Sequence, residues 1–156
     1  MNDEINELYQ QVILDHYKNP RNYGTLEPHN HEAEGFNPLC GDHYNIRLEV
    51  EDGIIKKIMF DGTGCAISKA SASVMTTLLE GKTLEEARKI FEDFHYVITS
   101  DVNTEIDFDR YVKIAVFAGV REFPSRIKCA NLAWHTMLEA IDEKSNKNNP
   151  VTTDKN

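Results

Sequence analysis

Apolar residues recur at intervals of three and four positions along several segments, a spacing that predicts amphipathic helices. Such helices are expected over residues 3–17, 68–80, 83–94, 111–118 and 126–141, the fourth on a weaker pattern than the others. Thr83 and Glu86 have the spacing of a capping box at the start of the third helix. Gly81 is expected to end the second helix, and Ser125 to cap the last one.

Two segments alternate between apolar and polar residues, which is typical of strands with one buried face. The sequence "YNIRLEV" over 44–50 alternates in this way, turns at 51–53, and returns through "IIKKIMF" over 54–60. These two segments predict a β-hairpin. The residues between the first helix and this hairpin are rich in His, Glu and Asn, and we interpret them as a polar connection.

Length and composition fit a single globular domain. The chain has 156 residues, 40% of them hydrophobic, which suffices for one buried core. Residues 1–143 contain no internal repeat or linker, so we predict one domain there. Residues 144–156 have almost no apolar side chain and predict a disordered polar tail.

Charge and hydropathy exclude several classes of partner. A formal net charge of -9 leaves no basic surface suited to a nucleic acid or an anionic membrane. The acidic, amphipathic start lacks the features of a signal peptide, and no apolar run reaches membrane-spanning length. We therefore predict a cytoplasmic protein that binds neither nucleic acid nor a membrane.

The three cysteines lie at the ends of predicted elements. Cys40 lies in "NPLCGD" before the hairpin, Cys65 follows the hairpin in "DGTGC", and Cys129 is expected in the first turn of the last helix. Three cysteines cannot all pair within one chain, so ligands, nucleophiles and core residues are the alternatives. The separations match no zinc-finger spacing, so local sequence alone is a weak metal signal.

The surroundings of the cysteines are more informative than their spacing. Positions close to helix N-termini predict a lowered thiol pKa for Cys65 and Cys129, and Asp42 offers a carboxylate near Cys40. The simplest alternative is three unrelated buried thiols, which Cys129 fits best. A thiol hydrolase built from Cys40, Asp42 and His43 is disfavoured, because residues so close in sequence hardly adopt triad geometry.

Three blocks, "NPLCGD", "GTGCAISKASASVMT" and "FPSRIKCANLAW", resemble the signature blocks of the IscU/NifU-like proteins of iron–sulfur cluster assembly. The opening "LYQQVILDHYKNPRN" resembles the first helix of that family. The resemblance implies an α+β fold in which a small antiparallel three-stranded sheet packs against several helices. It also implies a site at one end of the fold, made of three cysteines and an aspartate.

Departures from the scaffold members point to the SufU branch of this family. IscU-type scaffolds have a histidine directly before the third cysteine, where this chain has Lys128. Arg126 and the longer segment between the second and third cysteines also resemble SufU. By this resemblance, one zinc ion is held by four residues of the chain, namely Cys40, Asp42, Cys65 and Cys129.

The same resemblance implies a zinc-dependent sulfurtransferase that accepts persulfide sulfur on Cys40 from a SufS-type cysteine desulfurase. Such a protein is a second substrate and activator of the desulfurase, and it delivers sulfur to downstream cluster-assembly machinery. Three thiolates and one carboxylate outweigh the two charges of zinc, so a nearby cation such as Arg126 would stabilise the site. A scaffold that carries a transient [2Fe–2S] cluster and a purely structural zinc protein remain the alternatives.

Overall fold

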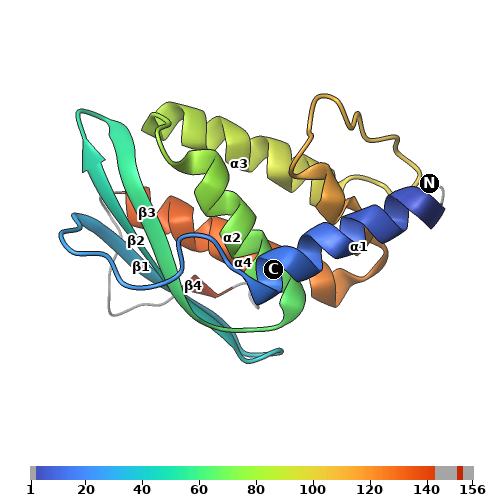
Figure 1. Ribbon diagram of the computed structural model, residues 1–156, viewed down its shortest axis with the longest axis horizontal. Helices are drawn as coiled ribbons and strands as arrows, with labels where there is room; N and C mark the ends of the chain where they lie inside the picture. Colours follow the sequence, from blue (N-terminus) through green and yellow to red (C-terminus); the bar gives the residue numbers. More distant parts are fainter. Residues whose placement is uncertain (1–2, 143–150, 153–156) are drawn as a thin grey trace.

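The computed structural model describes residues 3–142 and 151–152, which form four α-helices, a 3-10 helix and four strands (Figure 1). The helices are α1 (Asp3–Lys18), α2 (Ala66–Leu79), α3 (Leu84–Thr99), η1 (Ala115–Glu122) and α4 (Pro124–Ile141). The strands are β1 (His31–Asn37), β2 (Asp42–Glu51), β3 (Ile54–Thr63) and β4 (Val151–Thr152). Among these described residues, no helix combines the length and apolar character needed to cross a membrane.

The sheet has the strand order β3-β2-β1-β4. β2 pairs antiparallel with both β1 and β3, which confirms the three-stranded antiparallel sheet expected from the family resemblance. The two-residue β4 extends it by pairing parallel with β1 at Gly35 and Phe36. The disordered tail predicted over 144–156 otherwise lies outside the described residues.

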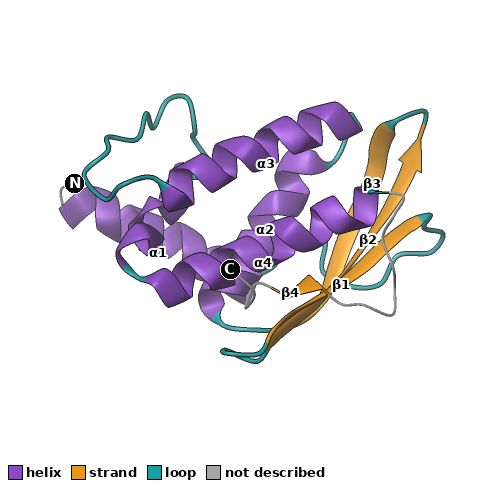
Figure 2. Ribbon diagram, turned by 180° about the vertical axis from the view of Figure 1, so that it is seen from behind, coloured by secondary structure: helices purple, strands orange, loops and turns teal. Residues whose placement is uncertain are grey.

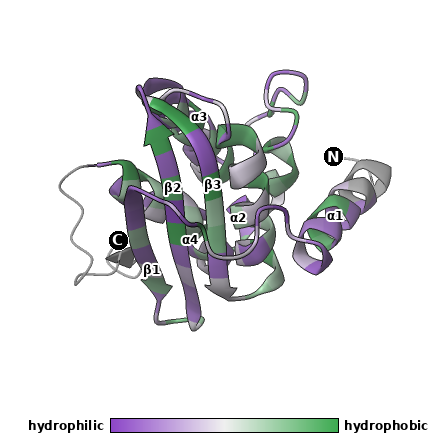
Figure 3. Ribbon diagram, turned by 60° about the vertical axis from the view of Figure 1, so that its left-hand side comes forward, coloured by the Kyte–Doolittle hydropathy of each residue, from purple (hydrophilic) through white to green (hydrophobic). Residues whose placement is uncertain are grey.

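Helices cover one face of the sheet (Figures 1 and 2). α4 packs across β1 and β2, α2 packs against β3, and α1 packs on α2 away from the sheet (Figure 3). Trp134 of α4 is fully buried at the centre, where it stacks on Phe94 of α3 and donates a hydrogen bond to Ser71 Oγ at 3.0 Å. The α+β fold class is therefore confirmed.

Strand β1 is the element that the hydrophobic pattern missed. Its inward-facing residues Ala33, Gly35 and Asn37 are all buried, but none is a large apolar side chain. A Cβ on Gly35 would overlap the Thr136 hydroxyl, so β1 and α4 pack too closely for a side chain there. Because β1 packs so closely on α4, its inward-facing positions hold small or polar residues, and the alternation of large apolar residues that predicts a strand is missing.

The helix ends expected from the sequence are confirmed for α2 and α3 but not for α4. The capping box of Thr83 and Glu86 is confirmed, and α2 ends just before Gly81, which has a φ of +86°. The Ser125 cap is wrong, because α4 already begins at Pro124 and Phe123 precedes it without a side-chain cap. Cys129 consequently lies in the second helical turn. The weak helical pattern over 111–118 corresponds to η1, shifted toward the C-terminus.

Candidate metal centre

Three of the four predicted metal ligands, Cys40, Asp42 and Cys129, come together at one end of the sheet, and Cys65 lies next to them. Cys40 lies in the loop between β1 and β2, and Asp42 is the first residue of β2. Cys65 directly precedes α2, and Cys129 lies on α4. The sheet pairing and the packing of α2 and α4 thus bring together three separate parts of the chain.

Distances within this cluster are short. Cys40 Sγ and Cys129 Sγ are 3.3 Å apart, and one ligand atom each from Cys40, Asp42 and Cys129 lie within 4.8 Å of one another. The Cys65 sulfur is not among these close atoms, but Cys65 lies next to them, because its backbone N–H donates to Asp42 Oδ1 at 3.0 Å. Thiolates and a carboxylate in such a group form a donor set suited to zinc.

The three thiols differ sharply in exposure. Cys40 is exposed, Cys65 is half-buried, and Cys129 is buried. The exposure of Cys40 follows from its loop, where the N–H groups of Cys40 and Gly41 both bond to Asn37 O, at 3.2 and 2.8 Å. Gly41 adopts a φ of +74°, a conformation that favours glycine and turns the chain back into β2.

Asp42 has the property expected of a metal ligand. Its side chain is only 1% exposed, and Oδ2 has no hydrogen-bond partner among the described residues. A buried carboxylate oxygen without a partner is costly unless an ion or a donor satisfies it. One carboxylate oxygen of Asp42 lies within 4.8 Å of the Cys40 and Cys129 sulfurs, so the residues present fit a bound cation.

The thiol pKa values follow from contacts between the cysteines. A hydrogen bond from Cys129 lowers the pKa of Cys65 to about 5, and the Ser68 N–H, which points at the Cys65 sulfur from the start of α2, adds to this effect. The pKa of Cys129 is raised, because its thiol bonds to Cys65, because it is buried, and because it also bonds to Cys40. The lowered pKa expected for Cys129 is therefore wrong. The helix dipole acts mainly within the first turn of a helix, and Cys129 lies beyond the first turn of α4.

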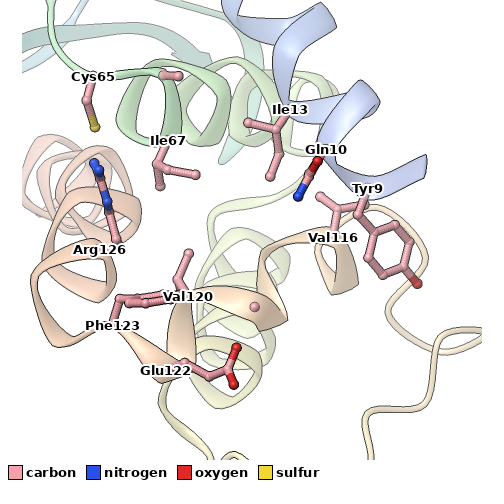
Figure 4. A pocket seen from close by; sticks show the side chains of 12 residues that line it. Tyr9, Gln10, Ile13, Cys65, Ile67, Val116, Val120, Glu122, Phe123 and Arg126 are labelled. Atoms are coloured by element: carbon pink, nitrogen blue, oxygen red, sulfur yellow. The ribbon is translucent and has the colours of Figure 1, made fainter. Parts of the chain in front are cut away.

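Arg126 lies next to the cluster on the side of Cys65. A groove with a volume of about 600 Å³ runs between α1, the start of α2, η1 and the start of α4, and both Arg126 and Cys65 line it. Figure 4 shows the guanidinium of Arg126 pointing toward the Cys65 sulfur. The side chain is exposed and has no hydrogen bond or ion pair to another described residue, so its donors are available to a ligand. The apolar groove beside it, which Ile13, Ile67 and Phe123 help to line, was not apparent from the sequence.

His43 does not belong to the cysteine cluster. It alternates with the inward-facing Asp42 and Tyr44, so its ring lies on the outer face of the sheet. There it hydrogen bonds to Glu34 of β1. This arrangement leaves Cys40 without a histidine base and argues against a thiol hydrolase.

The family of the chain follows from comparison with known proteins. A family model described as the NifU-like N terminal domain matches residues 8–130. The chain belongs to this family. The matched segment begins in α1 and ends just after Cys129, so it contains all four residues of the cluster.

Relatives of this NifU-like chain carry two kinds of name. It is 38% identical over 150 residues to the zinc-dependent sulfurtransferase SufU of Bacillus subtilis (strain 168), covering 94% of this chain and 98% of that protein. It is 37% identical over 144 residues to the iron–sulfur cluster assembly scaffold protein IscU of Streptococcus pyogenes serotype M1, covering 92% of this chain and 88% of that protein. Sequence identity alone therefore does not separate the two names.

Solved structures agree with the fold. A crystal structure of a hypothetical protein superposes with a TM-score of 0.78 at 36% identity, covering 88% of this chain and 99% of that one. A protein described as a candidate iron–sulfur cluster assembly scaffold for the SUF system of Fervidobacterium islandicum AW-1 superposes with a TM-score of 0.76 at 31% identity. That match covers 86% of this chain and 96% of the other.

Proposed function

We propose that the protein is a zinc-dependent sulfurtransferase that accepts persulfide sulfur from a cysteine desulfurase and supplies it for iron–sulfur cluster assembly. The observation that carries this proposal is the cluster itself, in which a buried carboxylate with an unpaired oxygen lies beside one exposed and one buried thiol. The relative named as a zinc-dependent SufU supports it. The proposal places the protein in the cytoplasm, with the desulfurase and downstream assembly proteins as partners.

Cys40, Asp42, Cys65 and Cys129 would hold the zinc ion. Zinc has no redox chemistry of its own, and when bound it would keep the thiols ionised at neutral pH. Cys65 is already disposed to ionise, since its pKa is lowered to about 5. The buried Cys129 and Asp42 are held by the packing of α4 and β2, whereas Cys40 lies in an exposed loop.

Cys40 is the thiol that a protein partner can reach, because it alone among the three is exposed. Its thiolate would attack the outer sulfur of the persulfide on the donor protein, as in thiol–disulfide exchange. A new S–S bond forms at Cys40 Sγ while the S–S bond of the donor breaks, and the donor cysteine leaves as a thiolate. One sulfur atom moves, and no external oxidant or reductant is required.

Arg126 is proposed to assist this transfer by binding negative charge beside the cluster. The thiolate that attacks and the thiolate that leaves are both anions, and the guanidinium, which lines the groove together with Cys65, would supply positive charge beside the cluster. Arg126 points toward Cys65, so it would act on the thiols beside the ion rather than as a ligand, and its charge also offsets the excess negative charge of the ligand set (Figure 4).

Replacing Arg126 with glutamine is expected to lower the rate of sulfur transfer by about 10-fold, the loss of one partly solvated charge-assisted hydrogen bond. Saturating zinc separates this effect from any change in zinc affinity that the loss of the nearby charge causes. The measurement is the initial rate of desulfurase turnover at saturating zinc. Arg88→Gln, which removes an exposed arginine of α3 outside the groove, is the matched control and should leave the rate unchanged. Equal rates for the two variants would remove Arg126 from the mechanism.

The function is tested by alanine production from cysteine by a cysteine desulfurase, with and without the zinc-loaded protein, under a mild reductant. A sulfur acceptor should accelerate turnover in a saturable way, because it removes the persulfide that blocks the next cycle. No acceleration by folded, zinc-replete protein would contradict the sulfurtransferase. Assembly of a stable [2Fe–2S] cluster would then favour the scaffold, because three thiolates and one carboxylate offer four ligands to such a cluster as well.

A further inference from the structure

Asn37, at the end of β1, is a buried polar residue that the proposed sulfur transfer does not use. Its Oδ1 accepts a hydrogen bond from the Leu39 N–H at 3.2 Å, which helps close the loop that carries Cys40. Its Nδ2 is also buried, yet has no hydrogen-bond partner among the described residues. A buried amide donor without a partner is disfavoured, so a partner is expected in the working state of the site.

The side chain of Asn37 lies on the same face of the sheet as Asp42. The two residues are opposite each other in the β1–β2 ladder, and opposite residues in an antiparallel pair project to one face with adjacent Cβ atoms. Both are buried, at 0% and 1% exposure. An unpaired donor, Asn37 Nδ2, and an unpaired acceptor, Asp42 Oδ2, are therefore neighbours in the same buried layer.

α4 runs antiparallel to β1, so the turn of α4 that contains Cys129 lies beside the end of β1 that contains Asn37. His31, where β1 begins, hydrogen bonds through Nδ1 to Ala140 O near the end of α4 at 2.8 Å. Further along, a Cβ on Gly35 would lie 3.2 Å from Leu132 Cδ1. The next inward-facing residue of β1, Asn37, lies two residues or about 6.6 Å further along the strand. The same distance along α4 is a little more than one helical turn, and from Leu132 it leads to the turn that contains Cys129.

We propose that Asn37 is a positioning residue whose Nδ2 donates a hydrogen bond to Asp42 Oδ2 when the site holds its metal ion. Oδ1 of the same carboxylate already accepts from the Cys65 N–H, so this second bond would fix the orientation of the whole group. A carboxylate oxygen has two lone pairs and can bind an ion while accepting one hydrogen bond. A neutral donor also suits a ligand set with excess negative charge.

The inference rests on the proposed zinc site, and zinc affinity in competition with a chromophoric chelator tests it. Asn37→Ala is expected to weaken zinc binding by about 10- to 100-fold, the usual effect of losing a hydrogen bond to a ligand. Asn37→Asp keeps an oxygen for the Leu39 N–H but removes the Nδ2 donor, so it should bind zinc at least as weakly. Asp101→Ala removes a similar turn-forming oxygen, which accepts from the Asn103 N–H on an exposed loop, and should change affinity by less than about 2-fold.

Coupling between the two residues distinguishes this role from loop closure alone. In an Asp42→Ala background, adding Asn37→Ala should change zinc affinity by less than about 3-fold, because the acceptor is already gone. The cobalt-substituted Asn37→Asp protein should show a shifted visible spectrum, since the Asp42 ligand is reoriented. Unchanged zinc affinity in Asn37→Asp, or an equal loss in the Asp42→Ala background, would overturn the inference while leaving the proposed function intact. Wild-type protein that binds no zinc would overturn both.

Discussion

The Cys40→Ser variant is expected to lose sulfur acceptance, with desulfurase acceleration reduced by at least about 100-fold, because a hydroxyl is a far weaker nucleophile than a thiolate. The fold should survive this change. Cys40 is exposed in a loop, and surface substitutions usually change the free energy of unfolding by less than about 0.5 kcal/mol. Alanine production measures the first effect, and thermal unfolding in excess chelator measures the second.

Cys65→Ser is the informative companion to this variant. It removes a half-buried thiol that points into the groove but that the proposal does not use as the acceptor (Figure 4). Its effect on sulfur transfer should follow its effect on zinc occupancy and disappear when zinc is restored to saturation. Sulfur acceptance by Cys40→Ser, together with its loss in zinc-replete Cys65→Ser, would assign the acceptor role to Cys65 instead.

Removal of zinc is expected to lower the melting temperature by roughly 8–16 °C. An ion present at about 1,000 times its dissociation constant adds about 4 kcal/mol to stability. For a domain of this length, each kcal/mol corresponds to roughly 2–4 °C. The ion would link β1–β2, α2 and α4, which otherwise meet at this end of the sheet around an unpaired buried carboxylate oxygen.

Thermal unfolding of metal-loaded and chelator-treated protein, with the metal content determined for each sample, measures this stabilisation. Asp42→Asn is the matched variant, because its amide oxygen can still accept from the Cys65 N–H while the ligand charge is lost. It should show a smaller difference between the two states. A melting temperature that does not respond to zinc would contradict the four-residue site.

Much of the fold was predictable because the relevant segments bury large apolar side chains. The β2–β3 hairpin and helices α1 to α4 all follow from periodicity, and the capping box at Thr83 follows from local hydrogen bonding. Strand β1 was not predictable in this way. Its buried positions are small or polar because α4 packs directly on Gly35, a tertiary constraint that leaves no hydrophobic signal.

The candidate residues of the site could be named from the sequence, but the contacts that set their pKa values and leave polar atoms unpaired could not. Its four residues came from sequence blocks that resemble a family, whereas the cysteine spacing alone indicated little. The opposite shifts in the pKa values of Cys65 and Cys129 depend on contacts between side chains that are 64 positions apart in the chain. The unpaired atoms of Asn37 and Asp42 likewise become visible only when the strands are paired.

The mass of the protein after brief reaction with a cysteine desulfurase and cysteine tests the central claim most directly. The account predicts an increase equal to one sulfur atom, removed by reductant and located by peptide mapping on the segment that contains Cys40. Zinc-loaded wild-type protein should show this increase, and Cys40→Ser should not. An increase located on Cys65 or Cys129, or none while the desulfurase itself becomes persulfidated, would contradict the assignment of Cys40 as the sulfur acceptor.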